Sequence, residues 1–329
     1  MAFIGALFFG FVPMFLFASI LYWLDRYEKE PKILLGAVFL WGVVVAAGGA
    51  FIINTVLGLG VYVFTGSEAI TDLSTGSIIA PIVEESLKGL AVLIVFLIFR
   101  REFDSILDGI IYAGIAAMGF AATENVYYIY TYGWQESGWE GFWFLVFVRV
   151  ILVGWQHPFY TAFTGIGLAM ARLSRNWGVK ILAPLVGFTV AIVGHSLHNT
   201  LASFMSGLLG LAAGTFIDWT GWFFMAIFII WMIAKEQNLL RHYLQDEVAA
   251  GTMTAAQYRT ATNSFAQSFA RLRGMGSGSF AATGRFYQVC GELAHKKNQL
   301  AKVGDESGNV AIIARLRAEL ASLSPRATA

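Results

Sequence analysis

Ionisable and amide side chains interrupt four strongly apolar stretches of this sequence. A charged side chain at membrane depth costs roughly 3 kcal/mol, so each one needs a partner or a function. Carboxylates and imidazoles together can activate water, relay protons or ligate a metal. The candidates are Glu84, Glu85 and Lys88 in 78–99, Glu124 and Asn125 in 106–130, His157 in 150–171, and His195, His198 and Asn199 in 180–203.

The spacing of these residues places several of them on shared helical faces. His195, His198 and Asn199 follow an i, i+3, i+4 pattern, so all three point the same way from one helix. Lys88 follows Glu85 by three residues and Glu84 by four. Lys88 can therefore pair with one carboxylate and leave the other free.

The depth of these residues within their apolar stretches is similar. Counted from the outer end of each stretch at the helical rise, Glu84 and Glu124 lie about 9 Å deep. His157 and His195 lie about 12 Å deep, and His198 about 8 Å. Scattered structural residues would share no depth, so the sequence predicts one polar layer, in the outer half of the bilayer, that four helices supply.

The composition is that of a membrane protein. Of the 329 residues, 57% are hydrophobic, 15% aromatic and 13% charged, against about 25% charged in soluble domains. These values exclude an ordinary cytosolic enzyme, and the net charge of +1 argues against a nucleic-acid partner. The single cysteine, Cys290, excludes an intrachain disulfide and a thiolate metal cluster.

The apolar runs predict an all-α, polytopic membrane bundle with about seven transmembrane helices in residues 1–234. A count of eight stays an alternative, because the segment before the last span is short and semi-polar. The predicted spans are 2–24, 33–57 (with an extension to 64 left open), 78–99, 106–130, 150–171, 180–203 and 208–233.

The loop charges predict the orientation of the bundle. Lys and Arg occur in the loops at 25–32, 100–105 and 172–180, whereas the loops at 65–77 and 131–141 have none. We therefore expect the N-terminus outside and the C-terminal tail in the cytoplasm.

The tail, residues 235–329, is polar and basic, with 12 Lys and Arg against 7 Asp and Glu. A capping-box pattern at Thr254 and Gln257 predicts a helix that runs towards Arg273, and two further helices are expected at 280–302 and 309–323. We interpret the tail as a small helical cytoplasmic domain of unknown function. Homo-oligomerisation and contact with anionic lipid are two open roles for it.

Other polar residues of the body have simpler explanations. Asp108 and Asp218 lie near span ends, where we expect them to be solvated. Arg149 either anchors its helix at the interface or holds a carboxylate. Asn125 can serve as a hydrogen bond between helices.

Two functional classes fit such a polar layer. In an intramembrane hydrolase, a glutamate takes a proton from water while His and Asn stabilise the substrate carbonyl. In a proton or metal-ion transporter, the same groups relay protons or bind the ion. The sequence has no internal repeat of the kind common in transporters, and the layer lies off-centre, so an enzyme is favoured.

The ordered blocks resemble those of the PrsW family of intramembrane proteases over about residues 1–234. The first is Glu84-Glu85-x-x-Lys88, the second ends in Glu124-Asn125, the third contains His157, and the fourth is His195-x-x-His198-Asn199. The family is similar to the CAAX-prenyl endopeptidases and bacteriocin-processing membrane proteins, which leaves a maturation or immunity protein as another alternative.

The resemblance implies cleavage of a single-span membrane protein near the outer face of a bacterial plasma membrane. It also implies that this substrate is an anti-sigma factor in a stress-signalling cascade. The cofactor is either Zn²⁺ or none, because related enzymes have been argued to be metal-free glutamate peptidases.

The resemblance also suggests a role for each residue. Glu84 would be the general base, and His157 and His195 would position water or a metal. Asn199 would donate to the oxyanion, and Glu85 would pair with Lys88. Arg149 and Asn125 would support the site, and the possible metal ligands are Glu84, Glu124, His157, His195 and His198.

Overall fold

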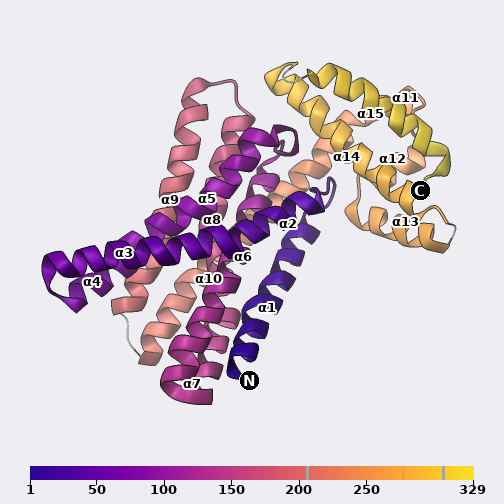
Figure 1. The fold of residues 1–329 in the computed structure, drawn as a ribbon. Helices are drawn as coiled ribbons and strands as arrows, with labels where there is room; N and C mark the ends of the chain where they lie inside the picture. Colours follow the sequence, from indigo (N-terminus) through magenta and orange to yellow (C-terminus); the bar gives the residue numbers. More distant parts are fainter. Residues whose placement is uncertain (205–206, 277, 306–307) are drawn as a thin grey trace.

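The computed structural model describes residues 1–204, 207–276, 278–305 and 308–329. The regular elements in these ranges are all helices, which confirms the predicted all-α class. Helices α1 to α10 form one bundle, and α11 to α15 gather at one end of it as a second group (Figure 1). The first group contains the apolar body and the second contains the tail.

The first helices follow the predicted spans, with more helix between them than expected. The loop predicted at 65–77 is largely helical, because Ser67 caps α4 through its side chain. The elements are α1 (Ala2–Leu24), α2 (Lys32–Leu40), a π-helical segment (Trp41–Ala46), α3 (Ala47–Thr65), α4 (Glu68–Ser74), a second π-helical segment (Thr75–Ile79) and α5 (Ala80–Ile98).

The middle of the body differs from the prediction. The expected loop at 131–141 is helical, and the chain reverses at Gly138, where φ is 61°. Such a φ favours glycine, because a Cβ would clash with the backbone. The elements are a 3₁₀ turn (Arg100–Glu102), α6 (Ile106–Tyr127), a π-helical extension (Tyr128–Gln135), α7 (Glu136–Val146), another π-helical segment (Phe147–Leu152) and α8 (Gln156–Arg172).

The predicted span 150–171 is therefore divided. Its first residues belong to the segment that ends at Leu152, and α8 begins only at Gln156. Pro158 lies in the first turn of α8, where its missing N–H costs no helical hydrogen bond. The helix break at 153–155 therefore lies ahead of Pro158.

The last two body helices are α9 (Trp177–Phe204) and α10 (Gly207–Tyr243). Helix α10 passes without a break through residue 234, where the sequence suggested a domain boundary. Five helical stretches in the described residues are long and apolar enough to span a membrane, and one of them, Ile106–Arg172, includes the reversal at Gly138 and the break at 153–155. The chain is thus a membrane protein, while the count of seven spans stays a prediction.

Helix α6 forms the centre of the bundle, and almost its entire length is buried. Neighbouring helices approach α6 closely at glycines. A Cβ on Gly165 of α8 would overlap the carbonyl oxygen of Gly109 on α6. This close packing fixes α8 against α6, so the polar residues near the start of α8 face those near the end of α6.

The described residues of the tail form five α-helices and a short 3₁₀ helix (Ser324–Arg326), which share a core. The capping box at Thr254 and Gln257 is present, but the helix that it starts is interrupted near Thr262. The elements are α11 (Gln245–Ala249), α12 (Ala255–Ala261), α13 (Ser264–Gly276), α14 (Phe280–Val303) and α15 (Asn309–Leu323). The last two agree with the predicted helices. The core gathers Phe286, Tyr287, Cys290, Leu293 and Leu320 with Tyr27 of the first loop and Leu240 of α10.

A buried polar contact, which we call the tail junction, joins the tail to the body through Glu28, Lys29, Asp104, Gln288, His295 and Lys296. The Lys296 ammonium donates to Asp104 at 2.6 Å, and His295 Nδ1 lies 3.0 Å from the same carboxylate. Gln288 exchanges two hydrogen bonds with the backbone of Lys29. The tail is therefore fixed to the first and third loops of the body.

Neighbouring charges determine which groups of the tail junction are protonated. Burial alone would lower the pKa of His295, but the Asp104 and Glu28 carboxylates raise that pKa well above its usual value. Burial would raise the pKa of Asp104, but Lys296 and His295 hold it below its usual range. His295 is consequently an imidazolium at neutral pH, paired with ionised Asp104.

The expectation that Asp108 is solvated is wrong. Asp108 is buried, and its carboxylate accepts hydrogen bonds from the backbone N–H groups of Asp104 (2.8 Å) and Ser105 (2.6 Å). It forms a capping box with Ser105 at the start of α6. A carboxylate in this position also stabilises the helix dipole.

Candidate active site

Helix α5 contributes three buried ionisable residues. Glu85 and Lys88 are fully buried, and Lys88 Nζ donates to Glu85 Oε1 at 2.5 Å. Thr161 Oγ1 of α8 donates to the other Glu85 oxygen at 2.8 Å. The pairing expected from the i, i+3 spacing is therefore present, and Glu84 is the carboxylate that Lys88 leaves free.

Glu84 has one oxygen without a hydrogen-bond partner. Its Oε1 lies 3.5 Å from Asn54 Nδ2 of α3. Its Oε2 is buried and has no hydrogen-bond partner among the described residues, and lies 3.8 Å from His195 Nε2. Buried polar atoms are rarely unpaired, so this oxygen is available to bind something else.

His195 on α9 is held in a defined orientation. Its Nδ1 lies 3.0 Å from Glu85 Oε1, and its ring stacks on Tyr160 with centroids 5.3 Å apart. Because a carboxylate only accepts, Nδ1 carries the proton and Nε2 presents its lone pair towards Glu84. This carboxylate–imidazole arrangement is typical of a metal-ligating or catalytic histidine.

His157, on α8, completes the other side of the cluster. Its Nε2 lies 2.9 Å from Glu124 Oε2 of α6, and its Nδ1 lies 3.2 Å from Lys88 Nζ. Arg149 forms an ion pair with Glu124 and donates to Asn125 Oδ1 at 2.9 Å. Of the two readings of Arg149, the structure supports the one in which it holds a carboxylate.

His198 lies in a neighbouring group. Its Nδ1 lies 3.1 Å from Asp218 Oδ2 of α10 and 2.8 Å from Gln156 Nε2. Asp218 is buried, with 6% of its surface exposed, so the expectation that it is solvated is wrong. The reason is that α10 packs against α8 and α9, whose side chains cover this carboxylate.

The Asn199 amide is bound to the segment that precedes α5. This amide donates to the carbonyl of Gly76 at 2.9 Å, and the neighbouring Ser196 donates to the carbonyl of Ser77. Both bonds fasten α9 to the π-helical segment before α5. Asn199 therefore helps to place the helix that carries Glu84 and Glu85.

The cluster fits a metal of the zinc type. Glu84, His157 and His195 each offer one ligand atom, and these atoms lie within 4.8 Å of one another. The unpaired Glu84 Oε2 and the lone pair of His195 Nε2 face the same space. One carboxylate and two imidazoles are a ligand set that Zn²⁺ prefers in hydrolases. Of the other two predicted ligands, Glu124 bonds to His157 and Arg149, and His198 lies with Asp218.

Three residues of these polar groups were not recognised in the sequence, namely Asn54, Gln156 and Tyr160. Gln156 directly precedes His157, and Asn54 is a lone amide in an apolar stretch. An amide within an apolar stretch is also the signal that identified Asn125. Tyr160 carries no sequence signal that separates it from the many other aromatic residues.

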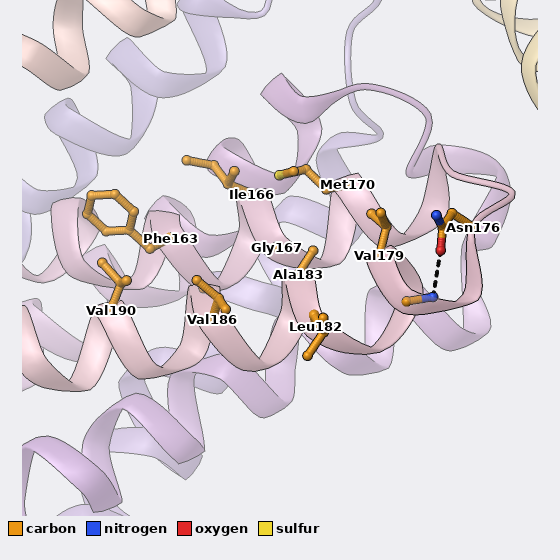
Figure 2. A pocket seen from close by; sticks show the side chains of 12 residues that line it. Phe163, Ile166, Gly167, Met170, Asn176, Val179, Leu182, Ala183, Val186 and Val190 are labelled. Atoms are coloured by element: carbon orange, nitrogen blue, oxygen red, sulfur yellow. Dashed lines mark hydrogen bonds between the residues drawn. The ribbon is translucent and has the colours of Figure 1, made fainter.

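A separate groove of about 530 Å³ lies between α8 and α9. Figure 2 shows that its lining is almost wholly apolar, with Phe163, Val186 and Val190 towards one end. At the other end Asn176 accepts a hydrogen bond from the backbone of Gly178 at 2.8 Å. Its lining includes no acid, base or nucleophile, so this groove is not the reaction centre.

Comparison with known proteins finds relatives named Protease PrsW in several bacteria. Protease PrsW of Clostridioides difficile is 37% identical over 107 residues, which are 32% of this chain and 43% of that protein. Protease PrsW of Bacillus subtilis is 30% identical over 167 residues, or 51% and 69%. Protease PrsW of Geobacillus kaustophilus is 26% identical over 165 residues, or 50% and 66%.

The alignments cover between about two fifths and two thirds of these relatives' own lengths. No solved structure matches the chain. Residues 30–233 match the family described as PrsW family intramembrane metalloprotease. This match covers more than half of the chain and includes every residue of the site described above, so the chain belongs to the PrsW family.

Proposed function

We propose that this chain is an intramembrane endopeptidase whose reaction centre lies between Glu84, His157 and His195. The observation that carries the proposal is the buried Glu84 Oε2, which lacks a hydrogen-bond partner among the described residues and faces His195 Nε2 at 3.8 Å. Glu28 of the tail junction also has an unpaired buried oxygen, but among the described residues it is the Glu84 oxygen that shares its space with two imidazoles, those of His157 and His195. This oxygen is free to bind water or a ligand between them.

In the first version of the mechanism, Glu84 is the general base. Its Oε2 accepts a proton from water, and the hydroxide attacks the scissile carbonyl carbon. The carbon–nitrogen bond then breaks, and Glu84 returns the proton to the leaving amine. His195 Nε2 and His157 orient the water.

In the second version, Glu84, His157 and His195 hold Zn²⁺, which would polarise the scissile carbonyl and make water more acidic. Glu84 cannot then be the base, because its free oxygen is used as a ligand. Glu124, which lies 2.9 Å from His157, is the next carboxylate able to move a proton.

The other residues of the cluster support these groups. Glu85, held by Lys88 and Thr161, keeps the proton of His195 on Nδ1. Arg149 holds Glu124 in place through an ion pair. Asn199 uses one amide N–H for Gly76, and its second N–H can donate to the oxyanion.

We further propose a substrate and a location. The substrate is a single-span membrane protein of the anti-sigma-factor kind, cut near the outer face of a bacterial plasma membrane. The positions of Lys and Arg in the loops support an outer N-terminus and a cytoplasmic tail. Unwinding a substrate helix is also less costly near an interface than at the midplane.

The test is cleavage of single-span fusion proteins by the purified chain in lipid nanodiscs. Glu84→Gln should abolish the product, while Glu140→Gln, the same change at an exposed glutamate of α7, should not. An arm with a chelator, followed by zinc, separates the two versions. Full cleavage by Glu84→Gln would overturn the proposed centre, and ion flux without any product would favour a transporter.

A further inference from the structure

Helix α13 of the tail has an exposed apolar face. Phe265, Phe269, Leu272 and Met275 are 60–65% exposed. At about 100° per residue, the first three lie within an arc of about 60°. The opposite face, with Ala270 and Gly274, is buried, so α13 presents to its surroundings the side that a soluble domain would bury.

An exposed apolar face of this kind is expected to bind a partner or a lipid surface. Soluble surfaces expose single apolar residues, and a contiguous aromatic and aliphatic stripe marks a binding surface. Phe280, at the start of α14, is also 51% exposed. The sequence of α13 contains two arginines, Arg271 and Arg273, and no acidic residue.

The position of α13 indicates what lies against its exposed apolar face. The guanidinium of Arg26 stacks on Trp23 at 3.6 Å from the ring centroid and lies 5.2 Å from the ring of Phe265. Trp23 is 55% exposed in the last turn of α1, which is long and apolar enough to span a membrane. The exposed face of α13 is thus continuous with the lipid-facing surface of α1.

The arrangement in space agrees with this continuity. Figure 1 shows α13 below α14 and α15, at the height of the upper turns of α1. Tryptophan and arginine at the end of a spanning helix are typical of the membrane interface. Arg26 contacts both Trp23 at the end of α1 and Phe265 of α13. Helix α13 therefore lies at the same membrane level as the end of α1.

We propose that α13 is an interfacial helix that rests in the leaflet on the tail side of the membrane. Its apolar stripe lies among the upper acyl chains, and Arg26, Arg271 and Arg273 contact anionic headgroups. The bilayer then holds the tail on one side, and the tail junction holds it on the other. This inference does not depend on the proposed peptidase activity.

Spin labels on the full-length protein test the proposal. Labels are placed at Phe269→Cys or Leu272→Cys in nanodiscs of phosphatidylcholine with phosphatidylglycerol, and at Ala314→Cys on the exposed side of α15 as a matched control. The native Cys290 is fully buried, so the label goes to the introduced thiol. Accessibility to oxygen and to a nickel chelate reports the depth of each label.

We expect the ratio of oxygen to nickel accessibility to be several-fold higher at both α13 positions than at Ala314. Equal, water-like ratios would overturn the proposal. Spin–spin broadening at α13 that disappears on dilution with unlabelled protein would show that a second copy covers the stripe. The same depth in pure phosphatidylcholine would overturn the role given to anionic lipid.

Discussion

The candidate active site and the tail junction use the same side-chain types in nearly the same arrangement. In the site, His195 Nδ1 lies 3.0 Å from Glu85, which also binds Lys88. The other ring nitrogen lies 3.8 Å from Glu84. A carboxylate thus orients the imidazole, a lysine neutralises that carboxylate, and a second carboxylate faces the free nitrogen.

The tail junction repeats this pattern with residues from two loops and α14. His295 Nδ1 lies 3.0 Å from Asp104, which also binds Lys296, and Nε2 lies 3.9 Å from Glu28. What it lacks, among the described residues, is a second imidazole near these groups. We infer that the His, Lys and carboxylate set alone makes a structural ion pair, and that His157 turns the set in the body into a reaction centre.

The largest expected difference is between Glu84, which faces His195 in the site, and Glu28, which faces His295 in the tail junction. Glu84→Gln should lower cleavage by roughly 10²-fold or more, because a general base or ligand is lost. Glu28→Gln should leave cleavage within about threefold, since its partner is a tail histidine. Product formation measured by mass spectrometry checks both. Equal losses in the two variants would contradict the division of roles.

The second prediction concerns the stability of the tail. Asp104→Asn leaves Lys296 and His295 buried without their carboxylate, which typically costs roughly 3 kcal/mol. We expect the tail to become sensitive to protease while the body stays intact. Asp305→Asn, at an exposed position of the same tail, is the control. An unchanged digestion pattern for Asp104→Asn would show that the junction does not hold the tail.

The sequence predicts site contacts between residues close together in the chain, but not contacts between residues far apart in the chain. Helical spacing alone predicts that Lys88 pairs with Glu84 or Glu85, and the structure selects Glu85. The shared face of His195, His198 and Asn199 also follows from spacing. The partners of the last two do not follow, because Gly76 and Asp218 come from other parts of the chain. Spacing fixes a direction, and only packing decides what lies there.

The fold shows the same limit. Apolar length predicts α1, and polar periodicity predicts α14 and α15. The reversal between the spans was predicted as a loop at 131–141, but the helix on both sides of Gly138 was not, because a single glycine in an aromatic segment does not reveal a positive φ. Composition separates the tail from the body, yet it cannot show that His295 pairs with Asp104, which lies almost two hundred residues earlier.

The third prediction uses pH to separate the clusters. The pKa of His295 is raised above 6.5 by Asp104 and Glu28, so its contribution to tail docking is complete below that pH and is lost as pH rises through the folded-state pKa. Glu28, whose pKa burial also raises, acts in the same direction. Asp104 has a lowered pKa and loses its contribution only in acid.

Hydrogen exchange of residues 99–105 should therefore quicken as pH rises above 6.5, beyond the intrinsic increase. His295→Ala should be fast throughout and free of this additional dependence. His242→Ala, at an exposed histidine, should behave as the parent does. A chelator should not change the exchange of this loop, and an effect of the chelator there would indicate that the tail junction also binds a metal.

The smallest expected effect is at Asp218. Its carboxylate contacts His198 and Gln156 beside the reaction centre, and it does not contact Glu84. Asp218→Asn keeps the shape of the side chain and removes its charge, so we expect cleavage to fall by less than about tenfold. A positioning role should appear mainly in KM, because His198 and Gln156 line a cavity of about 300 Å³ together with Arg149.

Asp72→Asn, at an exposed position of α4, is the matched control. A loss as large as that of Glu84→Gln would place Asp218 and His198 in the reaction itself, and the active site would then extend to α10.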